Sequence, residues 1–151
     1  MNYKIELMPS YYIFFIRHTG PYGPGNLLTM EKLKDWALTN LLLNDETIIL
    51  GIARDNPELT NPKDCRYDAC LVVSKNFCFQ DESINRDVLN RGKYAVFTIA
   101  HTADVIQQAW NDIFYELQKQ GLAIDYTKPI LERYITKMVQ NHLCELCIPI
   151  Q

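Results

Sequence analysis

The chain has 151 residues, of which 48% are hydrophobic and 22% are charged. This length and composition are typical of one globular domain that buries its core without needing a metal or a disulfide. The formal net charge of −3 has the wrong sign for a protein that coats nucleic acid.

The sequence shows no sign of membrane insertion or export. No apolar run approaches the ~18 residues of a membrane helix. The N-terminal stretch MNYKIELMPSYYIFF lacks the continuous apolar segment of a signal peptide. The five cysteines are an odd number without an export signal, which favours free thiols in a reducing compartment. We therefore expect a cytoplasmic protein with no membrane partner.

The first half of the chain predicts a strand, a helix and two further strands. Residues 11–19 (YYIFFIRHT) are rich in aromatic and β-branched side chains, which favour a strand. After the turn GPYGPG, residues 26–43 carry apolar side chains at helical spacing. Strands are expected at 48–53 and, after a loop full of turn residues, at 65–73.

The second half repeats this order after a polar loop at 74–92. A strand is predicted at 93–101, and a helix with one apolar face follows at 103–120. Another strand is predicted at 129–135. The last strand is HLCELCIPI, residues 142–150.

Two short matches indicate that the chain contains an internal repeat. The segment IRHTG at 16–20 matches IAHTA at 99–103, and each is a strand end that leads into a helix. The segment YDACLVV matches CELCIPI when Cys70 is set on Cys147. A repeated order of elements is a strong guide to a fold even when the residues themselves match weakly.

The repeat predicts an α+β fold in a single domain, residues 1–151. The two βαββ repeats are expected at about 1–78 and 92–151. Units of this kind pair into one antiparallel sheet with both helices on one face.

The C-x-x-C spacing in the last strand does not predict a thiol site. Side chains alternate between the two faces of a strand, so Cys144 and Cys147 point to opposite sides of the sheet. They can neither chelate one metal nor form a disulfide without breaking the strand. A redox C-x-x-C normally sits at a helix N-terminus, and no helix is predicted after this strand. We expect no metal site and no cofactor.

The same alternation draws attention to two acids. Glu145 faces away from the helix-packing side, and Asp68 is its counterpart in the first repeat. A carboxylate among apolar side chains is costly unless something neutralises it. Arg17, Arg66 or Lys93 are possible partners, and a solvated face is another explanation. The alternative is that both acids line a pocket and receive a cationic or hydrogen-bond-donating ligand.

Six segments, taken together and in order, resemble one known family. They are FFIRHTGPYG (14–23), GIARDNPELTNPKDCRYDACLVV (51–73), GKYAVFTIAH (92–101), AWNDIFYEL (109–117), KPILERY (128–134) and the closing CELCIPI. The chain resembles the GyrI-like family, the small-molecule-binding domain that also serves as effector-binding domain in AraC-type and MerR-type multidrug regulators. It begins MNYKIE, much as the stand-alone DNA gyrase inhibitor members of that family begin.

The resemblance implies two βαββ repeats with the helices on one side of the sheet and a ligand cleft on the other. It also implies that Glu145 is the carboxylate of this cleft, which in the regulators meets cationic aromatic drugs. Aromatic side chains around such an acid stack on these ligands. Trp110 and Tyr134 lie in matching motifs, although Trp110 fits plain core packing equally well. Glu132 matches a recurrent family acid for which a structural role is the alternative. The ligand-binding candidates are Glu145, Asp68, Tyr67, Trp110, Tyr134, Glu132 and Phe15.

Three functions fit these features. The first is a stand-alone protein that binds a cationic or amphipathic aromatic small molecule, without a DNA-binding domain of its own and without direct DNA binding. The second is inhibition of DNA gyrase by protein–protein contact. The third is hydrolysis of reactive small-molecule toxins, with Glu145 as general base and Tyr134 or Tyr67 holding the water or donating a proton. No oligomeric state follows from the sequence.

Overall fold

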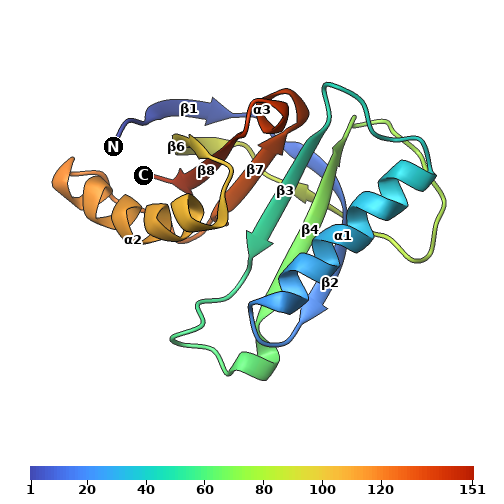
Figure 1. Ribbon diagram of the computed structural model, residues 1–151, viewed down its shortest axis with the longest axis horizontal. Coiled ribbons are helices and arrows are strands. Elements are labelled where there is room, and N and C mark those ends of the chain that lie inside the picture. The colour runs from blue at the N-terminus through green and yellow to red at the C-terminus, as the bar shows by residue number, and fades with distance from the viewer.

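The computed structural model describes residues 1–151, and one eight-stranded sheet forms most of it (Figure 1). The elements of the first half are β1 (Lys4–Met8), β2 (Tyr11–Thr19), α1 (Pro24–Thr39), β3 (Ile48–Ala53), the 3-10 turn η1 (Pro62–Asp64) and β4 (Arg66–Val73). Those of the second half are β5 (Asn85–Leu89), β6 (Gly92–Ala100), α2 (Ala103–Lys119), β7 (Leu131–Ile135), α3 (Thr136–Gln140) and β8 (Leu143–Pro149). No helix is both long and apolar enough to cross a bilayer.

The strands lie in the order β1-β6-β8-β7-β3-β4-β2-β5, and every neighbouring pair is antiparallel. The order β2–α1–β3–β4 recurs as β6–α2–β7–β8. The pairing of β3 with β7 joins these two units at the middle of the sheet. The sheet is strongly curled. Figure 1 shows this as a change in strand direction between β1 and the strands β4 and β2.

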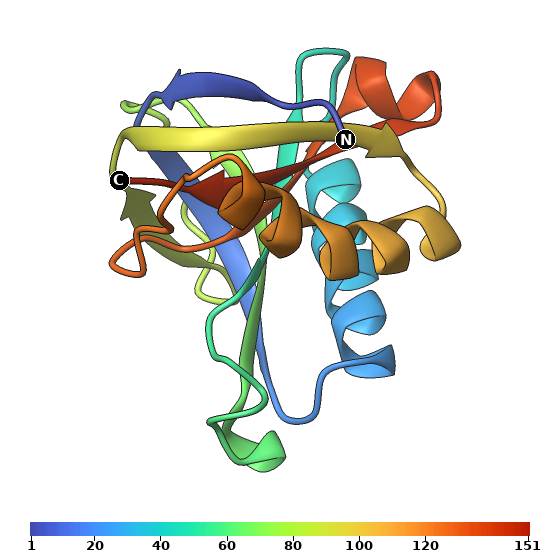
Figure 2. The ribbon, with the colours of Figure 1, turned by 90° about the vertical axis from the view of Figure 1, so that its left-hand side faces the viewer.

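Both long helices pack on the same face of the sheet. Leu33 and Ala37 of α1 are in one buried cluster with alternate residues of β4, including Ala69. Ile113 of α2 is in a second cluster with alternate residues of β8, including Leu146. Figure 2 shows α2 across the front and α1 behind it. The predicted α+β fold, one antiparallel sheet with both helices on one face, is therefore confirmed.

The opposite face of the sheet is closed. A cluster of twelve buried side chains fills it, and all eight strands contribute to this cluster. The curl of the sheet brings its distant strands around one shared interior, as in a partly closed barrel. This is the face on which the family resemblance implies the ligand cleft, and the side chains of the cluster pack against one another there. The position of the cleft stays a prediction. We call this cluster the inner core: Met8, Tyr11, Ile13, Phe15, Leu50, Ile52, Cys70, Leu89, Tyr94, Val96, Leu131 and Cys147.

Three elements were not predicted from the sequence: β1, β5 and α3. The strand β5 lies inside the segment that was taken for a polar loop, because four of its five residues are exposed and most of them are polar. It has a single neighbour, β2, so it lies at one edge of the sheet, and β1 lies at the other. The helix α3 has only five residues, which is too short for a helical repeat of apolar side chains to be visible.

The long helices begin and end close to the predicted residues. Pro24 stands in the first turn of α1, where its missing N–H costs nothing. The helix ends at Thr39 rather than at residue 43, since Leu41 has a positive φ of 58° and is 90% exposed. Thr102 caps α2, and its side chain accepts a hydrogen bond from the Val105 N–H at 3.3 Å.

Candidate functional site

The last strand separates its cysteines as strand alternation predicts. Cys144 lies in the buried cluster that contains Ile113 of α2 and Leu146 of β8, which we call the α2 cluster. Cys147 lies in the inner core, on the other side of the sheet. Both thiols are free and fully buried. Burial raises the pKa of Cys144 to about 11 and that of Cys147 to about 12, so neither thiol is ionised at neutral pH.

Glu145 has a cationic partner. It lies directly across from Arg133 of β7, whose Nε donates to Glu145 Oε1 at 2.8 Å. The side chains are 2% and 4% exposed, respectively. Arg133 also forms two hydrogen bonds with Glu6 of β1 and one with the Tyr11 hydroxyl. Lys4 Nζ lies 3.9 Å from the other oxygen of Glu145. Glu145 thus belongs to a closed ion-pair network on the inner face.

Asp68 is neutralised in the same way. It is fully buried and lies across from Arg17 of β2, which donates to both carboxylate oxygens at 2.7 and 2.9 Å. Arg54 donates a third hydrogen bond at 2.8 Å. Phe15 lies on the same inner face with the Arg17 guanidinium 5.4 Å from its ring centre. Asp68 and Glu145, the acids expected to meet a ligand, are thus each paired with an arginine of a neighbouring strand. Their contact with a ligand stays a prediction.

Glu132 differs from these two acids in its surroundings. It neighbours Arg133 on β7, so alternation directs it to the helix face of the sheet. It takes part in none of the ion pairs of the protein. Its side chain is half-buried, and its one hydrogen-bonding partner is the hydroxyl of Tyr134, which donates to it. Burial raises the pKa of Glu132, an effect that the hydrogen bond from Tyr134 opposes.

A second tyrosine, Tyr67, lies near Glu132 because residue 51 of the intervening strand is a glycine. Gly51 of β3 pairs with Ala69 on one side and with Glu132 on the other. A Cβ at position 51 would lie 2.5 Å from the Tyr67 hydroxyl, so the tyrosine crosses β3 over the space that the glycine leaves. Burial and then the charge of Glu132 raise the pKa of Tyr67, and the same two causes raise that of Tyr134. Glu132, Tyr67 and Tyr134 thus form one cluster on the helix face.

A pocket of about 440 Å³ opens beside this cluster. We call it the Tyr134 pocket. The ring of His101 lies 5.3 Å from that of Tyr134. Burial lowers the pKa of His101, and the nearby charges of Lys34 and His142 lower it further, so the imidazole is neutral at pH 7. The lining residues come from α1, the segment after it, β3, the segment after β6, β7 and α3: Lys34, Asp35, Leu38, Leu43, Asn44, Ile49, His101, Tyr134, Thr136, Val139 and Gln140.

Trp110 of α2 is the remaining aromatic candidate. It is half-buried, packs against the α2 cluster together with Tyr134, and stacks on Phe114 at 6.3 Å. Of the seven sequence candidates, the structure brings together Glu132, Tyr67 and Tyr134, and Trp110 lies on α2. The other three lie on the inner face. The residues that the sequence interpretation missed are Gly51, which makes room for Tyr67, and His101, which contacts Tyr134.

Comparison with known proteins identifies the family. The description "GyrI-like small molecule binding domain" matches residues 1–151. The chain belongs to the GyrI-like family. The SPbeta prophage-derived protein YosT of Bacillus subtilis (strain 168), named as a transcriptional regulator, is 39% identical over the full length of both chains. A DNA gyrase inhibitor of Pectobacterium carotovorum is 27% identical and covers 80% of this chain and 79% of its own.

Solved structures share the fold of this GyrI-like domain. EcmrR in its DNA complex matches with a TM-score of 0.73 at 14% identity, over 99% of this chain. The match spans only 57% of the EcmrR chain. SAV2435 bound to tetraphenylphosphonium matches with a TM-score of 0.64 at 14% identity, over 100% of this chain and 94% of its own. The chain is thus a small-molecule-binding domain by family, and structures of this fold contain ligands.

The network around Arg133 gives a prediction on stability. Arg133→Met leaves Glu145 buried without its closest cation, so we expect the free energy of unfolding to fall by about 3–5 kcal/mol. The double variant Arg133→Met, Glu145→Leu removes both charges and should recover much of this loss. Urea unfolding measures both. An unchanged midpoint in Arg133→Met would show that the network does not hold the sheet together.

Replacing Glu132 or Glu145 by Gln should change the free energy of unfolding in opposite directions. The pKa of Glu132 is raised in the folded protein above its ordinary value of 4.5, so deprotonation opposes folding as the pH rises through this range. Glu132→Gln should therefore increase the free energy of unfolding at pH 7, and the increase should vanish below about pH 4.5.

Glu145→Gln is the matched control. It removes the same charge from a site that contains Arg133, so it should lower the stability at pH 7. Urea unfolding from pH 4 to 8 compares the two variants. A stability loss in Glu132→Gln at pH 7 would contradict the assignment of Glu132 as the uncompensated acid.

Proposed function

We propose that this domain binds a cationic aromatic or amphipathic small molecule on the helix face of the sheet, with Glu132 as the carboxylate that recognises its positive charge. One observation carries the proposal. Asp68 and Glu145 each have an arginine within 2.8 Å, whereas Glu132 is half-buried with no cation at all. A ligand supplies the missing charge.

The electrostatics of the cluster support a cationic ligand. A deprotonated Glu132 is disfavoured by burial, as its raised pKa indicates. A cation next to it offsets that cost, and a partly buried site weakens the attraction less than open solvent does. Because only the charged carboxylate attracts the ligand, affinity should rise as the pH increases through the pKa of Glu132.

The side chains around Glu132 suit an aromatic or amphipathic ligand. Tyr67 and Tyr134 present rings beside the carboxylate, and Trp110 of α2 packs against the same buried cluster as Tyr134. Such rings attract cations over their faces and stack on other rings. The Tyr134 pocket, at about 440 Å³, falls within the usual range for small-molecule sites. SAV2435, which has this fold, has been solved with the aromatic cation tetraphenylphosphonium.

Titration calorimetry with tetraphenylphosphonium tests the proposal. This cation has no hydrogen-bond donor, so its affinity reports charge and aromatic contact alone. We expect saturable binding to the wild-type protein. Glu132→Gln should weaken this binding by about tenfold or more, because losing the attraction of a partly buried charge at close range costs about 1.4 kcal/mol or more of binding free energy.

Glu145→Gln serves as the control, measured at a temperature where it stays folded. Its carboxylate lies on the inner face, so the variant should bind tetraphenylphosphonium as the wild type does. A loss of affinity in Glu145→Gln, with Glu132→Gln unaffected, would assign recognition to Glu145 and overturn the proposal.

Hydrolysis is a second candidate, favoured by the hydrogen bond between Tyr134 and Glu132. A carboxylate with a raised pKa is a better general base, and an adjacent tyrosine can hold a water or donate a proton. The base in this reaction is then Glu132 and no longer the Glu145 of the sequence prediction. Turnover of an ester of a cationic aromatic alcohol, abolished in Glu132→Gln but not in Glu145→Gln, would establish it.

Inhibition of DNA gyrase stays a prediction. It rests on the 27% identity to a protein named as a DNA gyrase inhibitor. A supercoiling assay with excess protein decides it, and a ligand for the Tyr134 pocket can be added to the same assay. We also propose that the domain does not bind DNA itself, in keeping with its net charge of −3.

A further inference from the structure

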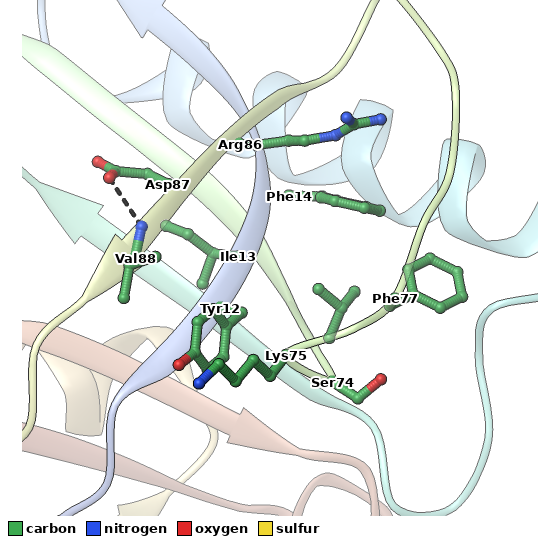
Figure 3. Close-up of a pocket in the computed structure, with 10 residues that line it drawn as sticks. Tyr12, Ile13, Phe14, Ser74, Lys75, Phe77, Arg86, Asp87 and Val88 are labelled. Atoms are coloured by element: carbon green, nitrogen blue, oxygen red, sulfur yellow. Dashed lines mark hydrogen bonds between the residues drawn. The ribbon is translucent and has the colours of Figure 1, made fainter.

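A second hollow lies at the β5 edge of the sheet, and its charge is opposite to that of the Glu132 cluster. It has a volume of about 310 Å³ and opens between β2, β5 and the loop after β4 (Figure 3). We call it the edge pocket. Its lining residues are Tyr12, Ile13, Phe14, Val73, Ser74, Lys75, Phe77, Arg86, Asp87 and Val88.

The strand register builds the base of the edge pocket. Tyr12 lies across from Val88, and Phe14 lies across from Arg86, so these four side chains share one face of the β2–β5 pair. Val88 is 44% exposed, which shows that no helix covers this end of the sheet face. Phe77 of the loop packs on Phe14 at 5.6 Å and forms a wall.

The cations of the edge pocket have no acidic partners. Arg86 and Lys75 take part in none of the ion pairs of the protein. Arg86 lies with its guanidinium 5.2 Å from the centre of the Phe14 ring, and Lys75 lies on the opposite side of the hollow (Figure 3). The one lining acid, Asp87, points away from the hollow and accepts a hydrogen bond from the Val88 N–H at 2.7 Å (Figure 3).

We propose that the edge pocket binds a small aromatic anion, a carboxylate or sulfonate on one or two fused rings. The ring would lie against Tyr12, Phe14 and Phe77, where aromatic pairs gain from stacked or edge-on contact. The acid group would meet Arg86, whose planar guanidinium offers two parallel N–H donors to such a group, and Lys75 adds a second positive charge. A volume of about 310 Å³ limits the ligand to this size.

The edge pocket is separate from the Tyr134 pocket, because α1 lies between them. Lys34 and Leu38 of α1 line the Tyr134 pocket. Trp36 of the same helix contacts the loop after β4, packing on Phe79 at 5.5 Å and donating a hydrogen bond to Asp81 at 2.7 Å. The two pockets share no lining residue, so a cationic and an anionic ligand bind without competing for contacts.

Titration of the full chain with 1-naphthoate, followed by NMR or calorimetry, tests the proposal. We expect saturable binding at millimolar concentration or tighter. Arg86→Gln should weaken it about tenfold, because it removes the bidentate charged contact. Val88→Glu, which places a negative charge at an exposed position of the pocket, should abolish it. Saturating tetraphenylphosphonium should leave the naphthoate affinity unchanged.

Glu132→Gln is the control for the other pocket and should bind 1-naphthoate as the wild type does. The cationic analogue 1-naphthylmethylammonium should gain no affinity from the edge pocket, so Arg86→Gln should not weaken its binding. Absence of saturable naphthoate binding would overturn the proposal. Equal affinities in wild type, Arg86→Gln and Val88→Glu, each shown to be folded by its thermal melting curve, would overturn it as well.

Discussion

The ion pair between Arg133 and Glu145 places the positive charge of β7 on the inner face of the sheet. The two faces therefore differ in the cations that they offer to buried acids. Arg133 closes a network on the inner face with Glu145, Glu6 and Tyr11, and this network joins β1, β2, β7 and β8. Its neighbour in sequence, Glu132, necessarily points the other way, because side chains alternate along a strand. The one cation in β7 is therefore placed where it cannot serve Glu132.

Under our proposal, this difference between the two faces explains why Asp68 and Glu145 are structural and Glu132 is available to a ligand. Burying a charge is costly unless a partner is close, and the inner face supplies such partners for both Asp68 and Glu145. The helix face supplies only tyrosine hydroxyls around Glu132. The hydrogen bond from Tyr134 moderates the cost of the charge without cancelling it. Such a site favours a cationic ligand, because the ligand supplies the positive charge that no side chain provides to Glu132.

Much of the fold followed from the sequence, because the strands with mixed aromatic and β-branched residues and the helix with one apolar face are strong local signals. The short elements did not follow. The β5 strand is polar and has one neighbour, and α3 is a little more than one turn, so neither leaves a periodic pattern. The curl of the sheet also escaped prediction. It depends on how eight strands twist together, and it gathers side chains of all eight strands into the inner core.

The surroundings of the candidate acids were predicted only in part, for a physical reason. Strand alternation correctly placed Asp68 and Glu145 on the face away from the helices, but their partners depend on cross-strand register. Arg133 faces Glu145 only because β7 pairs with β8 in one particular alignment. The same alternation, applied to the segment LERYI, separates Glu132 and Tyr134 from Arg133 and could have selected Glu132. The contribution of Gly51, in contrast, depends on the packing of Tyr67 and has no signal in the sequence.

The most direct measurement is an NMR titration of the Glu132 side-chain carboxyl carbon, with and without tetraphenylphosphonium. In the free protein, the pKa of Glu132 should lie above its ordinary value of 4.5, and binding of the cation should lower it. A free-protein pKa at or below 4.5 that the cation does not change would contradict the account, because Glu132 would then already be compensated.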